Sequence, residues 1–130
     1  MFGETGIFGQ FELSIDSKGR IAIPVNTKRE EGEELVLLYN EDFKIYEIYS
    51  AKRLEERFEE LNDLLLKSST EKQKRFYEIR LLKLSKSILK TSKISSQGRM
   101  LTGKVFEEYE KVKTTGAYDH LIIEPIKKKK

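Results

Sequence analysis

The sequence predicts an α+β fold in which a duplicated unit of β-strands is interrupted by helices, and three observations support this. Residues 10–15 carry apolar side chains at every second position, which is typical of a half-buried strand. In the middle of the chain, apolar residues recur at spacings of four and three, as on one face of a helix. The runs Ser17-Lys18-Gly19-Arg20 and Ser96-Gln97-Gly98-Arg99 lie 79 residues apart, which indicates internal duplication.

The first half predicts a strand, a tight turn and a second strand. Asp16 and Gly19 occupy the first and fourth positions of a type I turn. The apolar alternation resumes after Gly19 and stops at Pro24, because proline interrupts a strand. The turn is therefore expected at the end of a two-stranded ribbon. The other elements expected in this half are a short helical turn within residues 24–31 and buried strands at residues 35–39 and 44–49.

Two amphipathic helices are expected between the halves. The first begins after Ser50, a favourable N-cap, and ends near Ser68. Its apolar face comprises Leu54, Phe58, Leu61 and Leu65. Thr70 and Gln73 fit a capping box for the second helix. The buried stripe of the second helix is expected to comprise Phe76, Ile79 and Leu82.

The second half repeats the order of the first. Ser95 and Gly98 take the turn positions of Asp16 and Gly19, and serine preserves the side-chain acceptor that such a turn uses. A short helix with Val105, Tyr109 and Val112 is expected next, followed by a strand at residues 119–124. Each half is too small to bury a good core alone, so the halves are expected to close on one another. The expected divisions are a first repeat at 7–50, a helical connector at 51–86, a second repeat at 87–126 and a basic tail at 127–130.

The composition excludes several kinds of chemistry. The chain has no cysteine, which rules out disulfides, thiolate zinc sites and a cysteine nucleophile, and which fits a reducing compartment. His120 is the only histidine, and its place before an apolar run is more typical of a strand end than of a ligand. No set of nucleophile, base and orienting group can be assembled. We therefore expect no enzyme, no metal or other cofactor and no small-molecule substrate. The absence of a membrane-spanning run and of a signal peptide at the start favours the cytoplasm.

The charge distribution is uneven along the chain. The net charge is only +3, but residues 1–66 hold 8 Lys and Arg against 15 Asp and Glu, while residues 67–130 hold 17 against 7. This asymmetry is a recognised hint of nucleic-acid contact. A solvated helix face explains it equally well. A third interpretation is that the acidic half of one subunit meets the basic half of another.

The two turns are the candidate site. They present Lys18 beside Arg20 and Gln97 beside Arg99. Arginine can bridge guanine or phosphate, glutamine can pair with adenine, and the backbone at a glycine can approach phosphate closely. A single turn of this kind is common in hairpins, so the duplication is what favours DNA contact. Three further basic residues, which could add phosphate contacts or only solubility, are Lys28, Arg29 and Lys104.

Phe8-Gly9 and the run from Ile15 to Pro24 resemble the N-terminal signature of the MraZ family, and the resemblance continues to the second turn. It implies a swapped-hairpin barrel of the AbrB/SpoVT type in a ring-like homo-oligomer that binds double-stranded DNA. It also implies binding to direct repeats upstream of the division and cell-wall gene cluster, usually as a repressor, and nucleoid association. The DNA-contacting positions carried over from the family are Lys18, Arg20, Lys28 and Arg99.

The chain departs from the family pattern in its second half, with Ser95 for the usual Asp, Gly103 for Pro and Pro125 for Trp. Because Lys18 and Gln97 differ, either the two turns read different bases or one only clamps the backbone. Two other functions remain open. One is an AbrB-like or antitoxin-type regulator of another operon. The other is a protein-interaction module that uses the acidic face at residues 55–63 and the basic middle without binding DNA.

Overall fold

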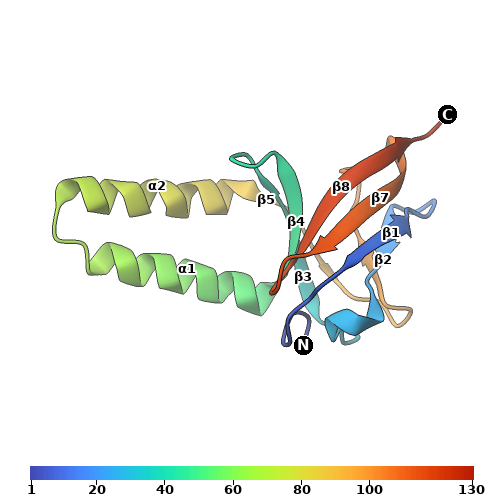
Figure 1. Ribbon diagram of the computed structural model, residues 1–130, viewed down its shortest axis with the longest axis horizontal. Helices are drawn as coiled ribbons and strands as arrows, with labels where there is room; N and C mark the ends of the chain where they lie inside the picture. The colour runs from blue at the N-terminus through green and yellow to red at the C-terminus, as the bar shows by residue number, and fades with distance from the viewer.

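The structure is a computed structural model that describes all 130 residues. A hairpin of two helices extends away from a body made of β-strands (Figure 1). The α+β class predicted from the sequence is confirmed. The elements are β1 (Gln10–Ser14), β2 (Arg20–Ala22), the 3-10 helix η1 (Val25–Thr27), β3 (Glu34–Asn40), β4 (Ile45–Ser50), α1 (Ala51–Leu66), α2 (Glu71–Ser87), β5 (Ile88–Lys93), β6 (Arg99–Leu101), β7 (Tyr109–Gly116) and β8 (Leu121–Lys128).

The two halves of the chain exchange strands. Six strands form one antiparallel sheet in the order β1-β7-β8-β4-β3-β5, and β2 pairs with β6 in a second sheet. Thus β1 of the first half pairs with β7 of the second, and β5 of the second half pairs with β3 of the first. Since each half completes the sheet of the other, they close on one another as expected.

One apolar core fills the β body. Ile21 and Met100 enter it from the paired strands β2 and β6, and both are fully buried. The other buried members are Phe2, Ile7, Ile23, Leu35, Leu37, Ile48, Ile94, Phe106, Val112, Leu121 and Ile123. A smaller cluster of Val36, Leu38, Tyr49 and Leu54 joins α1 to the opposite face of the sheet. The helical hairpin is therefore anchored only at its base.

Both helices begin where the sequence predicts. The hydroxyl of Ser50 accepts a hydrogen bond from the backbone N–H of Arg53 at 3.0 Å, and Thr70 accepts one from Gln73 at 3.1 Å. These bonds satisfy donors that the first turn of a helix leaves free. The side chain of Gln73 accepts a hydrogen bond from the N–H of Ser69, one residue before the cap. In the usual capping box this side chain accepts from the N–H of the N-cap residue itself.

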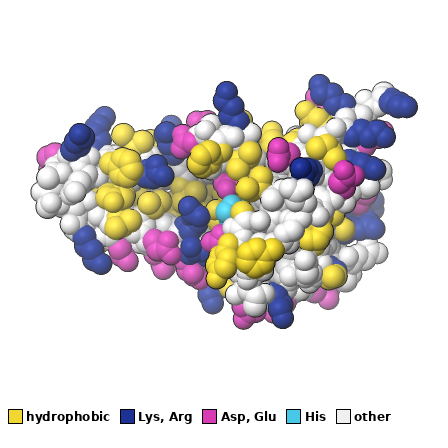
Figure 2. Space-filling view, viewed as in Figure 1, with side chains coloured by type: hydrophobic (Ala, Val, Ile, Leu, Met, Phe, Trp, Pro, Cys, Tyr) yellow, Lys and Arg dark blue, Asp and Glu magenta, His cyan; other side chains and the backbone are white.

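The buried stripe expected on α2 is wrong. Phe76, Ile79 and Leu82 are 52%, 43% and 54% exposed, and α2 has no fully buried residue. The helix packs on α1 alone for most of its length, so only its inner side is partly covered and the other apolar side chains face solvent. Figure 2 shows hydrophobic side chains gathered among basic ones on the helical arm, which is the hairpin formed by α1 and α2.

The short helix expected around Val105, Tyr109 and Val112 is also wrong. Residues 103–108 form turns, and both Tyr109 and Val112 lie in β7. This strand pairs with β1 on one side and β8 on the other, so its backbone groups are satisfied on both edges. Its β-branched side chains suit a strand. The strand β5, which leads into the second turn, was not predicted.

Candidate nucleic-acid interface

The first turn is a three-residue loop held by its own backbone. The N–H of Gly19 donates to the carbonyl of Asp16 and the N–H of Asp16 donates to the carbonyl of Arg20, both at 3.0 Å. Gly19 has a φ of 76°, the left-handed conformation that the third position of such a loop requires. The Asp16 carboxylate also accepts from the backbone N–H groups of Arg20 and Lys18, each at 2.9 Å. The bond from Arg20 is the main reason that the pKa of Asp16 lies below its ordinary value. The side chain of Lys18 is exposed at the tip.

The second turn has the same geometry. Gly98 donates to the carbonyl of Ser95, and Ser95 donates to the carbonyl of Arg99, both at 2.9 Å. Gly98 has a φ of 73°, and the Ser95 hydroxyl accepts from the N–H of Arg99 at 3.1 Å. Serine therefore replaces aspartate without changing the loop, and Gln97 is exposed at the tip.

The strands that flank each turn do not form the ribbon that we expected. After the turn, β1 and β2 share one isolated bridge between Ile15 and Ile21. They then diverge, β1 to pair with β7 and β2 to pair with β6. The reason is that the side chain of Ile21 is buried in the core, so β2 turns away from β1 and toward the interior of the β body. The ribbon that exists is made of β2 and β6, with one strand from each turn.

Each turn is fixed to the opposite half of the chain through the carbonyl of its glycine. The carbonyl of Gly19 accepts from both the backbone N–H and the hydroxyl of Thr102, each at 2.8 Å. The carbonyl of Gly98 accepts from the N–H of Ile23 at 2.9 Å. A side chain on Gly19 would meet the backbone oxygen of Gly103 at 2.8 Å. The two turns are therefore held in a fixed relation.

The pairing of β2 with β6 brings the two turn arginines together. Ala22 lies opposite Arg99 and Arg20 lies opposite Leu101, and alternate residues of paired strands share a face, so both arginines lie on the face away from the core. Arg20 Nε is 2.9 Å and Arg99 Nη1 is 3.3 Å from the same oxygen of Asp16. The arginine side chains remain 28% and 40% exposed. Two guanidinium charges against one carboxylate leave the cluster positive.

The other basic candidates lie outside this cluster. Lys28 is exposed, with a φ of 62°, and no hydrogen bond or ion pair joins it to Asp16. The guanidinium of Arg29 occupies the space where a side chain on Gly98 would lie, so it packs on the second turn. Lys104 is exposed and makes no ion pair. Among the candidates, the structure thus brings together only Asp16, Arg20 and Arg99 through their side chains.

Sequence reasoning missed a second polar cluster, around His120. Its Nε2 lies 2.8 Å from Glu47 and its Nδ1 lies 2.8 Å from Asp119. Asp119 also accepts from Arg53 Nε at 2.6 Å, and the imidazole stacks on Tyr49 with ring centroids 4.4 Å apart. Only the pairing of β4 with β8 reveals this proximity, which no local motif signals. The histidine is visible where the arm meets the β body (Figure 2). Because these groups satisfy one another, the cluster joins α1 to the sheet.

Burial alone would lower the pKa of His120. The hydrogen bonds to Glu47 and Asp119, together with the charges of these two carboxylates, outweigh burial and place the pKa of His120 above its ordinary value. For Asp119, burial acts to raise the pKa, but the bonds from His120 and Arg53 lower it more. The charged forms of these groups thus stabilise one another.

These features define a class: an α+β protein in which two equivalent Gly-Arg turns, one from each half of the chain, meet at a shared carboxylate. No helix in it is both long and apolar enough to cross a membrane. No protein-family model matches the chain. Over 108 residues it is 31% identical to the transcriptional regulator MraZ of Caldanaerobacter subterraneus subsp. tengcongensis, an alignment that covers 82% of this chain and 68% of the relative. The chain belongs to the MraZ family.

Proposed function

We propose that this protein is a transcriptional regulator that binds double-stranded DNA through its paired Gly-Arg turns. The observation that carries the proposal is the meeting of Arg20 and Arg99 at Asp16 on one exposed face. Two forked donors held a few ångströms apart suit guanine edges or adjacent phosphates. The name of the relative from Caldanaerobacter, a transcriptional regulator, agrees with this function.

Each turn residue has a distinct role in the proposed complex. Arg20 and Arg99 contact DNA directly, and Asp16, which pairs with both guanidinium groups in the free protein, competes with DNA for them. Lys18 and Gln97 extend from the two tips, where Lys18 reaches phosphate and Gln97 pairs with adenine. Lys28 supplies a further phosphate contact from the end of η1.

The target and cellular setting follow from the family resemblance. The protein binds direct repeats upstream of the division and cell-wall gene cluster, represses that cluster, and associates with the nucleoid in the cytoplasm. Its architecture is a swapped-hairpin barrel of the AbrB/SpoVT type, which is supported by the exchange of β1 and β5 between the halves. The repeats occupy residues 7–50 and 87–126, with the connector at 51–86 and the basic tail at 127–130.

The proposal includes a ring-like homo-oligomer, so that several turns face DNA at once. The outer face of α2 supports self-association because it presents exposed apolar side chains beside lysine and arginine. The outer face of α1 is acidic, with Glu55, Glu59 and Asp63 all exposed. The α2 face of one subunit therefore complements the α1 face of the next in charge.

Fluorescence anisotropy with labelled DNA tests the DNA-binding function. The probe is the upstream region that carries the direct repeats, at two stated salt concentrations and against scrambled competitor. We expect wild-type protein to resist the competitor. The variant Arg20→Ala/Arg99→Ala should bind at least about fivefold more weakly per arginine, since a base contact contributes roughly 1–3 kcal/mol.

The matched control is Lys52→Ala/Lys67→Ala, which removes the same charge from exposed positions on the helical arm and should bind as the wild type does. Circular dichroism melting must show that both double variants are folded. Equal binding by all three proteins, or none by any, would reject the paired turns as a DNA site and favour the interaction module.

A further inference from the structure

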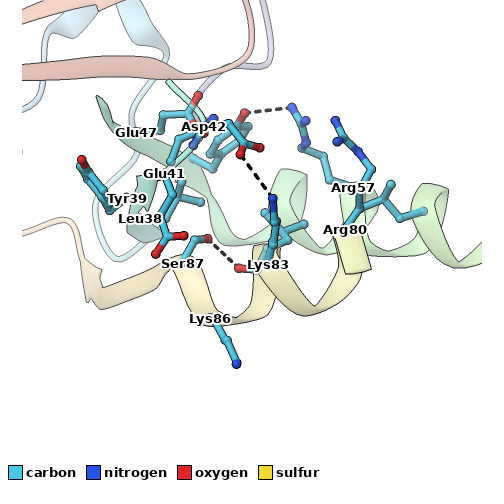
Figure 3. Close-up of a pocket in the computed structure, with 14 residues that line it drawn as sticks. Leu38, Tyr39, Glu41, Asp42, Glu47, Arg57, Arg80, Lys83, Lys86 and Ser87 are labelled. Atoms are coloured by element: carbon cyan, nitrogen blue, oxygen red, sulfur yellow. Dashed lines mark hydrogen bonds and ion pairs between the residues drawn. The ribbon is translucent and has the colours of Figure 1, made fainter. Parts of the chain in front are cut away.

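A cavity of about 280 Å³ lies between the base of the helical hairpin and the tip of the β3-β4 hairpin. The helices contribute Arg57, Arg80 and Lys83, and the apolar part of the wall comprises Leu38, Leu61 and Leu84. Figure 3 shows the three basic side chains directed from the helices toward the strands, whereas Lys86 points away. The cavity has the mixture of an apolar wall and a few convergent polar groups that is typical of small-molecule sites.

The two arginines of this cavity are not neutralised within the chain. No carboxylate lies within 4.0 Å of Arg57 or Arg80. Arg57 donates once, to the hydroxyl of Tyr49 at 2.8 Å, with its guanidinium 5.3 Å from the Tyr49 ring centroid. Arg80 makes no hydrogen bond and lies over Phe76 at 5.2 Å. Most of the ten N–H donors of these two groups, five on each arginine, are therefore available to a ligand.

The acidic groups that line the cavity do not cancel this charge. Asp42 pairs with Lys83 at 3.4 Å, and Glu47 pairs with His120 at 2.8 Å. Glu41 lies on the opposite side of the cavity from Arg57 and Arg80 (Figure 3). The repulsion between two like charges in one cavity is relieved by a bound anion.

We propose that this cavity binds a small phosphate monoester. Arg57 and Arg80 hold the phosphate through their forked donors, and the organic group lies against the apolar wall formed by Leu38, Leu61 and Leu84. Two guanidinium groups offer more donors than a carboxylate with two oxygens can accept, whereas a phosphate monoester presents three terminal oxygens. The site is formed by the helical arm and the β3-β4 hairpin, so it does not depend on the DNA-binding role of the turns.

Isothermal titration calorimetry with phenyl phosphate at constant ionic strength tests the site on the full-length protein. We expect one saturable site per chain with a dissociation constant below about 1 mM. Arg80→Gln should weaken binding at least about tenfold, and it should fold normally because Arg80 makes no hydrogen bond. Arg57→Gln should weaken binding as well.

Arg75→Gln is the matched control, because Arg75 is an exposed cation of α2, the helix that carries Arg80, and does not line the cavity. It should retain the wild-type affinity. The proposal is overturned if phenyl phosphate gives no saturable heat, or if Arg75→Gln and Arg80→Gln weaken binding equally. Equal binding of inorganic phosphate or benzoate would overturn the assignment of a phosphate monoester.

Discussion

Asp16 Oδ2 in the first turn lies 3.3 Å from Arg99 Nη1 in the second, although 83 residues separate them in the chain. The same oxygen accepts from Arg20 Nε at 2.9 Å. The hydroxyl of Ser95 supports the second turn but offers no carboxylate to Arg99, so Arg99 uses the carboxylate of the other half. Because the second turn has serine where the first has aspartate, Arg20 and Arg99 share a single carboxylate.

Changing Asp16→Ser should strengthen DNA binding severalfold at low salt. The turn should remain intact, because Ser95 already supports an equivalent loop, while both arginines lose the anion that competes with DNA. The measurement is anisotropy over a salt series with the same DNA probe.

The reciprocal variant Ser95→Asp is the control, and it should weaken binding because Arg99 gains an anion of its own. If Asp16→Ser weakens binding as much as Arg20→Ala does, Asp16 acts by orienting the arginines, and the competition argument is wrong.

Gly19→Ala should destabilise the protein more than Gly32→Ala. Both glycines have a positive φ, 76° and 80°, so each substitution carries a backbone cost of roughly 1–2 kcal/mol. Only at Gly19 does the new side chain also meet a backbone oxygen, that of Gly103 at 2.8 Å, whereas nothing lies within 4 Å at Gly32. Gly19→Val should be worse still, because a β-branched residue resists positive φ.

Urea unfolding of these variants gives the comparison. The difference between the two alanine variants isolates the close approach of the turn to the opposite half. Equal losses of unfolding free energy would show that the turn can move away from Gly103.

Raising the pH from 6 to 9 should reduce the contribution of His120 to the free energy of unfolding. Its folded pKa lies above the ordinary value of 6.5, so the contribution is complete below about pH 6.5 and is lost as the pH rises through the folded pKa. The measurement is the unfolding free energy of the wild type minus that of His120→Gln at several pH values between 6 and 9.

Subtracting the His120→Gln variant removes the contribution of other groups that titrate in this range, such as the N-terminal amine. The difference should shrink with rising pH. A difference that stays constant would show that the pKa of His120 does not change on folding, so that Glu47 and Asp119 give its charged form no net stabilisation.

Phe76→Ser/Ile79→Ser should reduce self-association. Both side chains are exposed on α2, so their removal should leave the fold of the subunit intact while deleting apolar contact area between subunits. Sedimentation velocity should show a smaller particle than for the wild type.

Val25→Ser is the matched control, because Val25 is a 76% exposed apolar residue outside the arm and should sediment as the wild type. If the Phe76→Ser/Ile79→Ser variant and the Val25→Ser control both sediment as the wild type does, the helical arm is not the subunit interface.

Local patterns predicted the local structure well. The turn at residues 16–19 and the N-caps Ser50 and Thr70 are set by bonds between near neighbours, so their residue types are enough to place them. The stripe of Phe76 and Ile79 was predicted correctly as one helix face, but the spacing of apolar residues does not say what covers them.

The arrangement of the site depended on contacts between distant residues. Val105, Tyr109 and Val112 have helical spacing, yet pairing of β7 on both edges decides their conformation. Asp16 was predicted only to form the turn, because its contact with Arg99 requires the pairing of β2 with β6. Arg57 and Arg80 likewise meet only through the packing of α1 on α2.

The exchange of strands between the halves also constrains how the chain folds during synthesis. Phe11 in β1 contacts Thr114 in β7 across 103 residues, so β1 leaves the ribosome long before its partner. Until β6 and β7 emerge, the first half exposes unpaired strand edges and the apolar side chains of an unfinished core, which are the features that promote aggregation. Folding must therefore be largely post-translational, and the many long-range pairings should make it slow.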